Sequence, residues 1–516
     1  MQLIGRTSTI ALLCITAVAC SPSPAQPDDI EDDVAEQPGD TPRLAIPDVD
    51  SPSFSDEAPD AEELADDGDV TSFRVGEVDV VHMPTPANEV VSARLYLRGG
   101  SANFDDPLQG IERLALAVAT NGGTESTPKD EFNARLDAVG SSIGFTTNRD
   151  YSGYTMRSVR DHFDETWDLF EQSIFEPAFD DSEVELRRDR QIASIQSIVD
   201  NPDRLVSEVA RDLTFADHPY AYRQLGTQES VSQFSTDELR QWHQTLLAPE
   251  RMLLVVVGNI DRDELVDKVQ QRLGRLEPTG AEVPSLPGID HDAPALRVEQ
   301  LDVPTNYILG YYAAPTIGHP DYPALVMATR HLRDRLFEEV RTKRNLTYSV
   351  SSNVGQRGDN VGFLYVSAVD PQATIPVMFD EVTRLQNETI DDEQLEKVRN
   401  VYLTGHYMDQ ETNSSIAGQL GRAELIGGDW RRSRQFVDDI MEVTPEDIRR
   451  VAETYMSNYQ FGVVGDPDEV PAELFGIDDG HVETVDEVDD VDPEQLDDAA
   501  EPEPEPEPQP EGGEPM

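Results

Sequence analysis

Hydrophobic positions along the chain follow two different periods, and the change from one to the other marks its most informative segment. Before Arg341, apolar residues recur at spacings of three and four, which predicts an amphipathic helix over 320–340. From Tyr348 onward the pattern alternates, which predicts a strand with Tyr348, Val350, Ser352 and Val354 on one face. Asn345 lies between the two, where a turn requires a residue that tolerates a left-handed backbone. Arg341 and Tyr348 are therefore expected to flank a helix-to-strand turn.

The same two periods predict that strands and helices are interspersed along both halves of the chain. In the first half we expect strands at 73–83, 90–97, 143–147 and 153–158, and helices at 110–120, 128–139, 161–174 and 181–199. In the second half we expect a strand at 306–313 and further helices near 374–386, 391–409, 414–426 and 445–456. Strands and helices in this order predict an α+β fold.

Similar segments recur in the two halves. Val257-Gly258 and Val464-Gly465 each end an apolar strand, 207 residues apart. That period is too long for a solenoid and indicates a duplicated domain. Pro and Gly concentrate between the two copies, at 276–296. We therefore expect two homologous α/β sandwiches over 73–285 and 286–470, each with a mixed, mostly antiparallel sheet.

Charge changes this picture mainly at the two ends of the chain. The sequence has 516 residues and a formal net charge of −62, with 102 acidic and 40 basic residues. Its ends are rich in Pro, Asp and Glu and poor in aromatic residues, so they cannot bury enough apolar surface to fold. We expect a disordered acidic linker over 21–72 and a disordered acidic tail over 471–516. An excess of negative charge also argues against nucleic acid or an anionic membrane surface as a partner.

Residues 1–20 have the pattern of a secretion signal, with Arg6 followed by an apolar run that is too short to span a bilayer. The last four of these residues, ending at Cys20, resemble a bacterial lipoprotein cleavage box, so Cys20 is expected to become a lipidated N-terminus. The alternative is an ordinary signal peptide with a chance cysteine. Because Ser21 rather than Asp follows Cys20, lipidation predicts a cell-envelope protein anchored to the outer membrane, facing the periplasm or the exterior.

Arg341 and Tyr348 are the candidate substrate-binding residues. A guanidinium and a phenol placed on either side of one turn can both donate hydrogen bonds to a single point, such as a peptide carbonyl or an oxyanion. The alternative is that both residues only support a buried strand. The sequence contains neither a phosphate-cradling glycine loop nor a nucleophile elbow, and no HxxEH occurs among its nine histidines.

Arg-x-x-x-x-Leu-x-Tyr at this junction resembles the Arg/Tyr pair in the second half of the insulinase (pitrilysin) family of zinc peptidases, which usually has Gly where Asn345 stands. The first half carries further landmarks in the order and spacing of that family: Gly99-Gly100-Ser101, Gly110, Gly123-Thr124, Asp150, Asp200-Asn201-Pro202, His218-Pro219-Tyr220, Gly226-Thr227 and Val257-Gly258. The resemblance spans about 73–470 and implies two domains that close around a peptide as a clamshell.

Active members of that family carry HxxEH on the helix that follows Gly110, and a further Glu completes the zinc ligands. The resemblance implies that Arg113 and Ala117 occupy the histidine positions, Leu116 the general-base position and Ser194 the third ligand position. These residue types do not hold zinc, because Ala and Leu have no donor atom and a guanidinium repels a cation. We therefore expect no catalytic residue, metal or other cofactor in this chain.

A lost zinc motif beside a retained Arg/Tyr pair resembles the noncatalytic subunit of bacterial two-chain members of the family. That resemblance implies a heterodimer in which an HxxEH-bearing partner supplies zinc, while Arg341 and Tyr348 hold the peptide substrate. One alternative is a peptide-binding or scaffolding envelope lipoprotein without a peptidase partner. Another is a metallopeptidase that acts alone with replacement ligands.

Overall fold

The computed structural model of the protein describes residues 45–47, 49, 51–477 and 481–485. The predicted signal, Cys20 and most of the two acidic segments lie outside these residues. All the elements below belong to one compact unit, Ile46–Met516. Within the described part of the chain, no helix is both long enough and apolar enough to cross a bilayer.

The first half is built on a seven-stranded sheet with the strand order β1-β2-β3-β7-β4-β6-β5. Its strands are β1 (Ala61–Asp66), β2 (Thr71–Val75), β3 (Val78–Pro84), β4 (Val90–Arg98), β5 (Ser142–Thr147), β6 (Tyr151–Val159) and β7 (Met252–Gly258). Only β3 and β7 pair in parallel. The helices are α1 (Ile111–Asn121), α2 (Lys129–Ala138), α3 (Phe163–Phe175), α4 (Asp181–Val199), α5 (Pro202–Thr214), α6 (Gln228–Gln233), α7 (Thr236–Leu246) and α8 (Arg262–Gln271).

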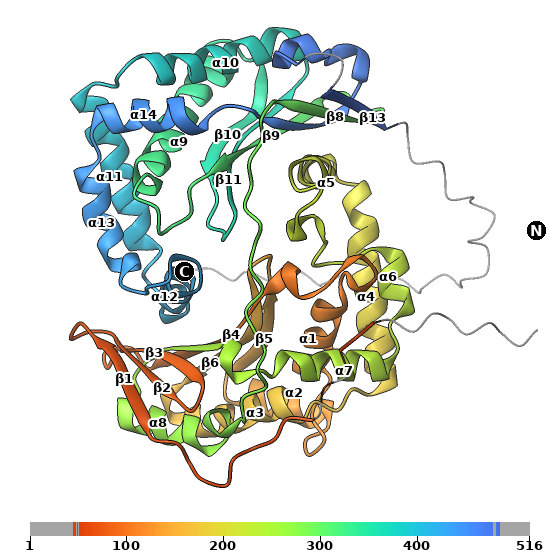
Figure 1. The fold of residues 1–516 in the computed structure, drawn as a ribbon, viewed down its shortest axis with the longest axis vertical. Helices are drawn as coiled ribbons and strands as arrows, with labels where there is room; N and C mark the ends of the chain where they lie inside the picture. The colour runs from red at the N-terminus through yellow and green to blue at the C-terminus, as the bar shows by residue number, and fades with distance from the viewer. Residues whose placement is uncertain (1–44, 48, 50, 478–480, 486–516) are drawn as a thin grey trace, which may run out of the picture. The chain divides into compact units, whose positions relative to one another are not determined.

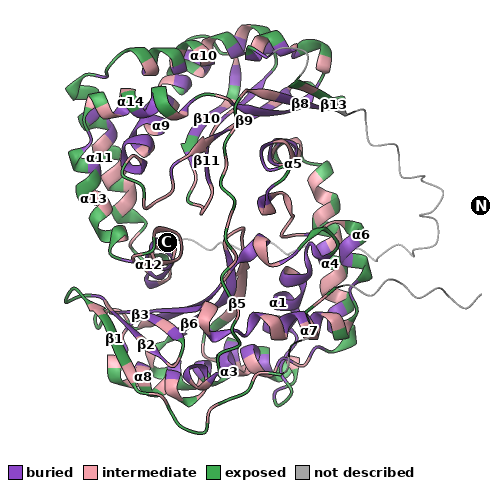
Figure 2. Ribbon diagram, in the orientation of Figure 1, coloured by how far each residue is buried: buried purple, intermediate pink, exposed green. Residues whose placement is uncertain are grey.

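The second half is built on a six-stranded sheet with the order β10-β11-β9-β12-β8-β13. Its strands are β8 (Ala295–Gln300), β9 (Asn306–Ala314), β10 (Thr347–Val354), β11 (Asn360–Ala368), β12 (Gln460–Gly465) and β13 (Val482–Val485). The helices are α9 (Tyr322–Leu336), α10 (Pro371–Asn387), α11 (Asp392–Met408), α12 (Asn413–Gly427), α13 (Arg432–Glu442) and α14 (Pro445–Tyr455). Apolar side chains of α9, α10 and α14 pack against this sheet and form its main core. Figure 1 shows the three helices along one side of the sheet, and Figure 2 colours much of the strands as buried. The prediction of an α+β fold with two mixed sheets is confirmed.

The folded part of the chain extends beyond the limits that composition predicts. Strand β1 lies inside the segment expected to be linker, and its main chain pairs antiparallel with β2. At the other end, Phe475 and Ile477 are buried in the core of the second half and β13 pairs with β8. Main-chain hydrogen bonds to an existing sheet edge order such segments even when few of their side chains are apolar. The range expected as one strand, 73–83, is two strands that meet at a turn through Gly76, whose φ is 61°.

Each half sends one helix onto the sheet of the other half. Helix α5 places Val206, Val209 and Ala210 against Leu309 and Val464 of the second sheet. Helix α12, in return, packs Ala417 and Leu420 against Tyr96, Leu253 and Val255 of the first sheet. These residues belong to a separate hydrophobic cluster between the two halves. Figure 1 shows α5 beside β8 and β9, and α12 next to β3 and β4. This exchange joins the two halves through buried apolar surface.

Candidate functional site

The segment with Arg341 and Tyr348 has the predicted helix-to-strand form. Helix α9 continues into a π-helical turn, Phe337–Thr342, and β10 begins at Thr347. Asn345 adopts φ 52°, the left-handed backbone predicted for the turn. Its N–H donates to the Arg341 carbonyl at 3.0 Å, and the Leu346 N–H donates to the Val340 carbonyl at 3.0 Å.

A β-bulge decides where Tyr348 points. Thr347 pairs with Ala368 and Val350 pairs with Val366, so β10 has one residue more than β11 over this interval. Beyond the bulge, Val350 and Val354 are buried beneath the helices, whereas the Tyr348 side chain is 83% exposed. The prediction that Tyr348 shares a face with Val350, Ser352 and Val354 was wrong, because an extra residue redirects the side chain next to it.

The structure brings Arg341 and Tyr348 into direct contact. The guanidinium carbon of Arg341 lies 5.1 Å from the centre of the Tyr348 ring and 4.8 Å from that of Phe337. Contact with two aromatic rings restricts the position of the guanidinium. Among the described residues, no side-chain hydrogen bond or ion pair engages the Arg341 guanidinium or the Tyr348 hydroxyl. Both groups are therefore available as donors to a ligand.

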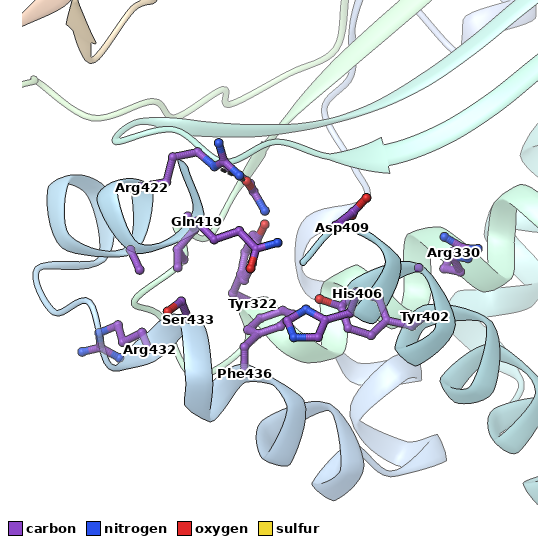
Figure 3. Close-up of a pocket in the computed structure, with 14 residues that line it drawn as sticks. Tyr322, Arg330, Tyr402, His406, Asp409, Gln419, Arg422, Arg432, Ser433 and Phe436 are labelled. Carbon is purple, nitrogen blue, oxygen red and sulfur yellow. Dashed lines mark hydrogen bonds between the residues drawn. The ribbon is translucent and has the colours of Figure 1, made fainter. Parts of the chain in front are cut away.

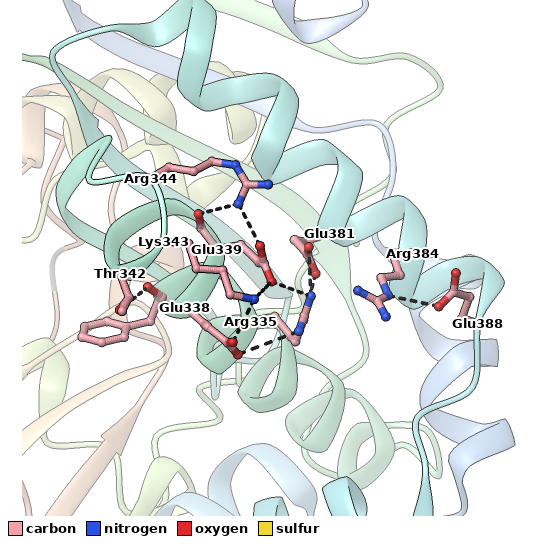
Figure 4. A network of polar contacts seen from close by, with 10 residues as sticks. Arg335, Glu338, Glu339, Thr342, Lys343, Arg344, Glu381, Arg384 and Glu388 are labelled. Carbon is pink, nitrogen blue, oxygen red and sulfur yellow. Dashed lines mark hydrogen bonds and ion pairs between the residues drawn. The ribbon is translucent and has the colours of Figure 1, made fainter.

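An ionic network around Glu339 supports the turn that carries Arg341. The Glu339 carboxylate accepts from Lys343 at 2.7 Å, from Arg344 at 2.7 Å and from Arg335 at 3.1 Å (Figure 4). Arg335 also bonds Glu381 of α10 at 3.0 Å. The hydrogen bonds from Lys343 and Arg344 lower the pKa of Glu339 from 4.5 to about 2. Two residues before Arg341, the π-helical turn is thus tied to both α9 and α10.

We expect Glu339→Gln to lower stability at neutral pH and to lose that effect in acid. Because the folded-state pKa of Glu339 is depressed, its contribution is present above pH 4.5 and is lost as the pH falls towards 2. Glu339 itself is buried, but its partners Lys343 and Arg344 are exposed to solvent, which screens the ion pairs and limits their combined contribution to about 1 kcal/mol. Urea unfolding of the wild type and Glu339→Gln should show a gap in the free energy of unfolding at pH 7 that narrows below pH 4.5 and closes as the pH approaches 2. A gap independent of pH would show that the carboxylate's charge does not stabilise the turn.

The four positions that the family resemblance assigns to a zinc site hold side chains that do not fit a metal. Leu116 is fully buried and Ala117 is 9% exposed, both without a donor atom. Arg113 donates to the Thr147 hydroxyl at 3.3 Å and stacks 5.4 Å from the centre of the Phe145 ring, and burial lowers its pKa without removing its charge. The Ser194 hydroxyl donates to the Arg190 carbonyl at 2.9 Å on the neighbouring helix α4. Over the described residues, no group of three His, Cys, Asp or Glu side chains could hold a metal ion.

A cavity of about 520 Å³ lies where the two halves meet, and the sequence analysis did not predict it. Five arginines from four separate segments line it: Arg149, Arg211, Arg223, Arg357 and Arg422. None of them belongs to a sequence motif, so only the fold brings them together. We call this site the arginine cavity.

A second cavity, of about 270 Å³, lies between α9, α11, α12 and α13 in the second half. Figure 3 shows His406 and Tyr402 next to each other on one side of this cavity, and Arg422 on another side. Gln410 donates to His406 at 2.9 Å, so this histidine already has a hydrogen-bond partner. Arg422 and Gln356 line both cavities.

Comparisons with solved structures define the class of protein to which this fold corresponds. An M16 peptidase inactive domain from Pseudomonas fluorescens superposes with a TM-score of 0.70 at 18% identity, covering 77% of this chain and 97% of that one. A protease from Helicobacter pylori gives the same TM-score and identity over 79% and 99% of the two chains. The fold is therefore that of M16 peptidase proteins.

Sequence comparison identifies the family. Residues 79–228 match the insulinase model of peptidase family M16, and residues 233–402 match the peptidase M16 inactive domain. The chain is an M16 insulinase-family peptidase homologue. The resemblance stated from its motifs is confirmed at that level.

Named relatives extend over most of the chain. An uncharacterized zinc protease of Mycobacterium leprae is 26% identical over 76% of this chain and 90% of its own length. Another uncharacterized zinc protease, from Bacillus subtilis, is 22% identical over 77% of this chain and 98% of its own length. The mitochondrial-processing peptidase subunit beta of Dictyostelium discoideum is 20% identical over 71% and 82%.

Proposed function

We propose that this chain is a noncatalytic subunit of a two-chain peptidase. In this proposal a partner subunit bearing HxxEH supplies zinc and the general base, and this chain supplies Arg341 and Tyr348 to the bound peptide. Peptide hydrolysis would then require both polypeptides. A peptide-binding or scaffolding protein without a peptidase partner and a metallopeptidase acting alone are the competing functions.

One contrast within the molecule carries the proposal. The positions that would hold zinc and activate water are occupied by Arg113, Leu116 and Ala117, which can do neither. Arg341 and Tyr348, in contrast, lie in contact, with Arg341 half-buried, Tyr348 exposed and their turn supported by ion pairs. A processing-peptidase subunit among the relatives is consistent with a multi-chain enzyme.

The two functions can be divided physically between two polypeptides. Hydrolysis of a peptide needs an activated water on one side of the scissile carbonyl and donors that stabilise the oxyanion on the other. The guanidinium carbon of Arg341 lies 5.1 Å from the centre of the Tyr348 ring, and in this proposal an N–H of Arg341 and the O–H of Tyr348 both donate to one substrate oxygen. Their contribution is to hold the carbonyl oxygen and the negative charge that develops on it.

The test is to isolate the tagged full-length chain from the cells that produce it, and to assay it alone and with the proteins it retains. We expect an HxxEH-bearing polypeptide to co-purify, peptide cleavage only when both are present, and fewer than about 0.1 zinc per molecule of the isolated chain. Cleavage by the zinc-free chain alone, or near-stoichiometric zinc with cleavage, would overturn the proposal. Retention of peptides with no HxxEH partner would favour the binding protein.

A lipid tether at Cys20 in a bacterial outer membrane is part of the same proposal. Cys20→Ala should abolish incorporation of labelled fatty acid and release the chain from membranes. Labelling that persists in this variant would place the modification elsewhere.

A further inference from the structure

The arginine cavity concentrates positive charge in a strongly acidic protein. The chain has 40 basic residues against 102 acidic ones, yet five of the 16 residues lining this cavity are arginines and only two, Asp150 and Glu208, are acidic. Both halves contribute, because Arg357 lies on the β10–β11 hairpin and Arg422 on α12. The local sign of the charge is therefore the reverse of that of the whole chain.

Two of the five arginines are neutralised. Arg211 contacts Glu208 at 2.5 Å and Asp212 at 2.6 Å. Arg223 contacts the other oxygens of the same two carboxylates, at 2.7 and 2.8 Å. Two guanidiniums and two carboxylates thus form a closed square that leaves no net charge. This square builds a rigid wall from α5 and the loop that follows it.

The other three arginines have no carboxylate partner. Among the ion pairs of the described residues, none includes Arg149, Arg357 or Arg422. Arg149 donates to the Tyr220 carbonyl at 3.3 Å, and Arg422 donates to the Gln356 side chain at 3.1 Å. One terminal nitrogen of Arg357, Nη1, is buried without a hydrogen-bond partner in the described structure.

The remaining lining carboxylate does not compensate for this charge. Asp150 accepts from the Tyr220 hydroxyl and from the Gly358 N–H, the latter at 2.9 Å. Burial raises its pKa, although Arg357 and Arg149 lie close enough to oppose that shift. Burial and the neighbouring Arg357 lower the pKa of Arg149 to about 10, which leaves it charged at neutral pH. The cavity therefore keeps an excess of positive charge.

We propose that the arginine cavity binds a carboxylate of the peptide ligand, either an acidic side chain or the C-terminal carboxylate. Guanidiniums pair with carboxylates through two parallel hydrogen bonds, and an anion would satisfy the donor left open on Arg357. The ligand is taken to be a peptide because of the proposed function. Strand β5 lies at the open edge of the first sheet, and its last residue, Thr147, lines the cavity. An extended peptide pairing with that edge would bring its next residues to the arginines.

The test measures binding to the full-length chain alone, without any peptidase partner. The probe is a short peptide of small uncharged residues with two Glu near its C-terminus, labelled at its N-terminus with an uncharged fluorophore and read by fluorescence anisotropy. We expect the peptide with two Gln and an amidated C-terminus to bind at least about tenfold more weakly than the acidic peptide. Added salt should weaken the binding of the acidic peptide. Two further peptides show which carboxylate binds: one has the two Glu and an amidated C-terminus, and the other has two Gln and a free C-terminal carboxylate.

Arg357→Gln and Arg422→Gln should each lower the affinity for the acidic peptide about tenfold and leave the affinity for the neutral peptide unchanged. Arg449→Gln is the matched control: Arg449 lies on α14, pairs with Glu453 and does not line the cavity, so the change should alter the binding of neither peptide. Equal affinity for acidic and neutral peptides would overturn the proposal, as would unaffected binding in both cavity variants with an unchanged melting temperature. Tight binding of inorganic phosphate with no preference among peptides would overturn it as well.

These outcomes are independent of those for the proposed function. Loss of the carboxylate preference would remove this inference, while cleavage by the two-chain enzyme could still depend on Arg341 and Tyr348. Conversely, a chain without a peptidase partner could still bind acidic peptides in the arginine cavity. The two proposals therefore fail in different experiments.

Discussion

Tyr348→Phe should reduce kcat/KM for peptide cleavage by the reconstituted two-chain enzyme about 100-fold or more. The phenol is proposed to donate to the oxyanion, and loss of one such donor typically costs a factor of about 100 to 1000. Phe keeps the ring that stacks on Arg341, so the guanidinium should stay in place. Arg341→Ala should lower cleavage at least as much, because it removes a charged donor. Steady-state kinetics with a fluorogenic peptide measure both effects.

The matched control for this experiment is Tyr407→Phe, which alters an exposed tyrosine on α11, a different element of the same half. It should leave kcat/KM within about twofold of the wild type, as expected for a surface position away from the site. The assignment of the pair would be wrong if Tyr348→Phe and Arg341→Ala retained full activity while the two subunits still co-purified. An effect on KM alone would mean that the pair contributes ground-state binding only.

Gly462→Ala should destabilise the protein by about 3 kcal/mol, although it adds a single methyl group. A Cβ at Gly462 of β12 would lie 2.4 Å from the backbone nitrogen of Ala210 and 2.7 Å from its Cα. These atoms belong to α5, so relief requires a shift of the whole helix rather than a side-chain rotation. Because Glu208 and Arg211 lie on α5, the shift should also weaken binding in the arginine cavity. Chemical denaturation and peptide anisotropy measure the two effects.

Gly405→Ala is the control for this change. Gly405 lies within helix α11, and a Cβ there would meet nothing within 4 Å. Alanine has the higher helix propensity, so this variant should be as stable as the wild type or more stable by up to about 1 kcal/mol. Equal stability of the two variants would show that α5 does not pack tightly on the second sheet.

Local chemistry accounts for the parts of the fold that were predicted correctly. Helix α9, the turn at Asn345 and the start of β10 each follow from the residues within them, because hydrophobic period and left-handed tolerance are properties of neighbouring positions. The outward direction of the Tyr348 side chain does not follow from neighbouring residues in this way. A bulge depends on how β10 pairs with β11, and alternation alone cannot reveal an extra residue in one strand.

Pairing with another strand also explains the errors at the two ends of the chain. Composition predicts that the acidic residues before 73 and after 470 do not fold, since they contain too few apolar side chains. Strand β1 is ordered by main-chain hydrogen bonds to β2, and β13 by those to β8. Such bonds depend on the presence of a free sheet edge, which composition does not report.

The amino-acid sequence was sufficient for the family and for the helix-to-strand turn at Asn345, because each depends on residue types at fixed spacings. The duplication, the loss of zinc-ligand chemistry and the roles of Arg341 and Tyr348 also come from the sequence and stay predictions. Tertiary structure alone decided that α5 and α12 cross between the halves and that arginines from distant segments meet in one cavity. Burial and charge balance act between residues that are neighbours in space, and those neighbours exist only once the chain has folded.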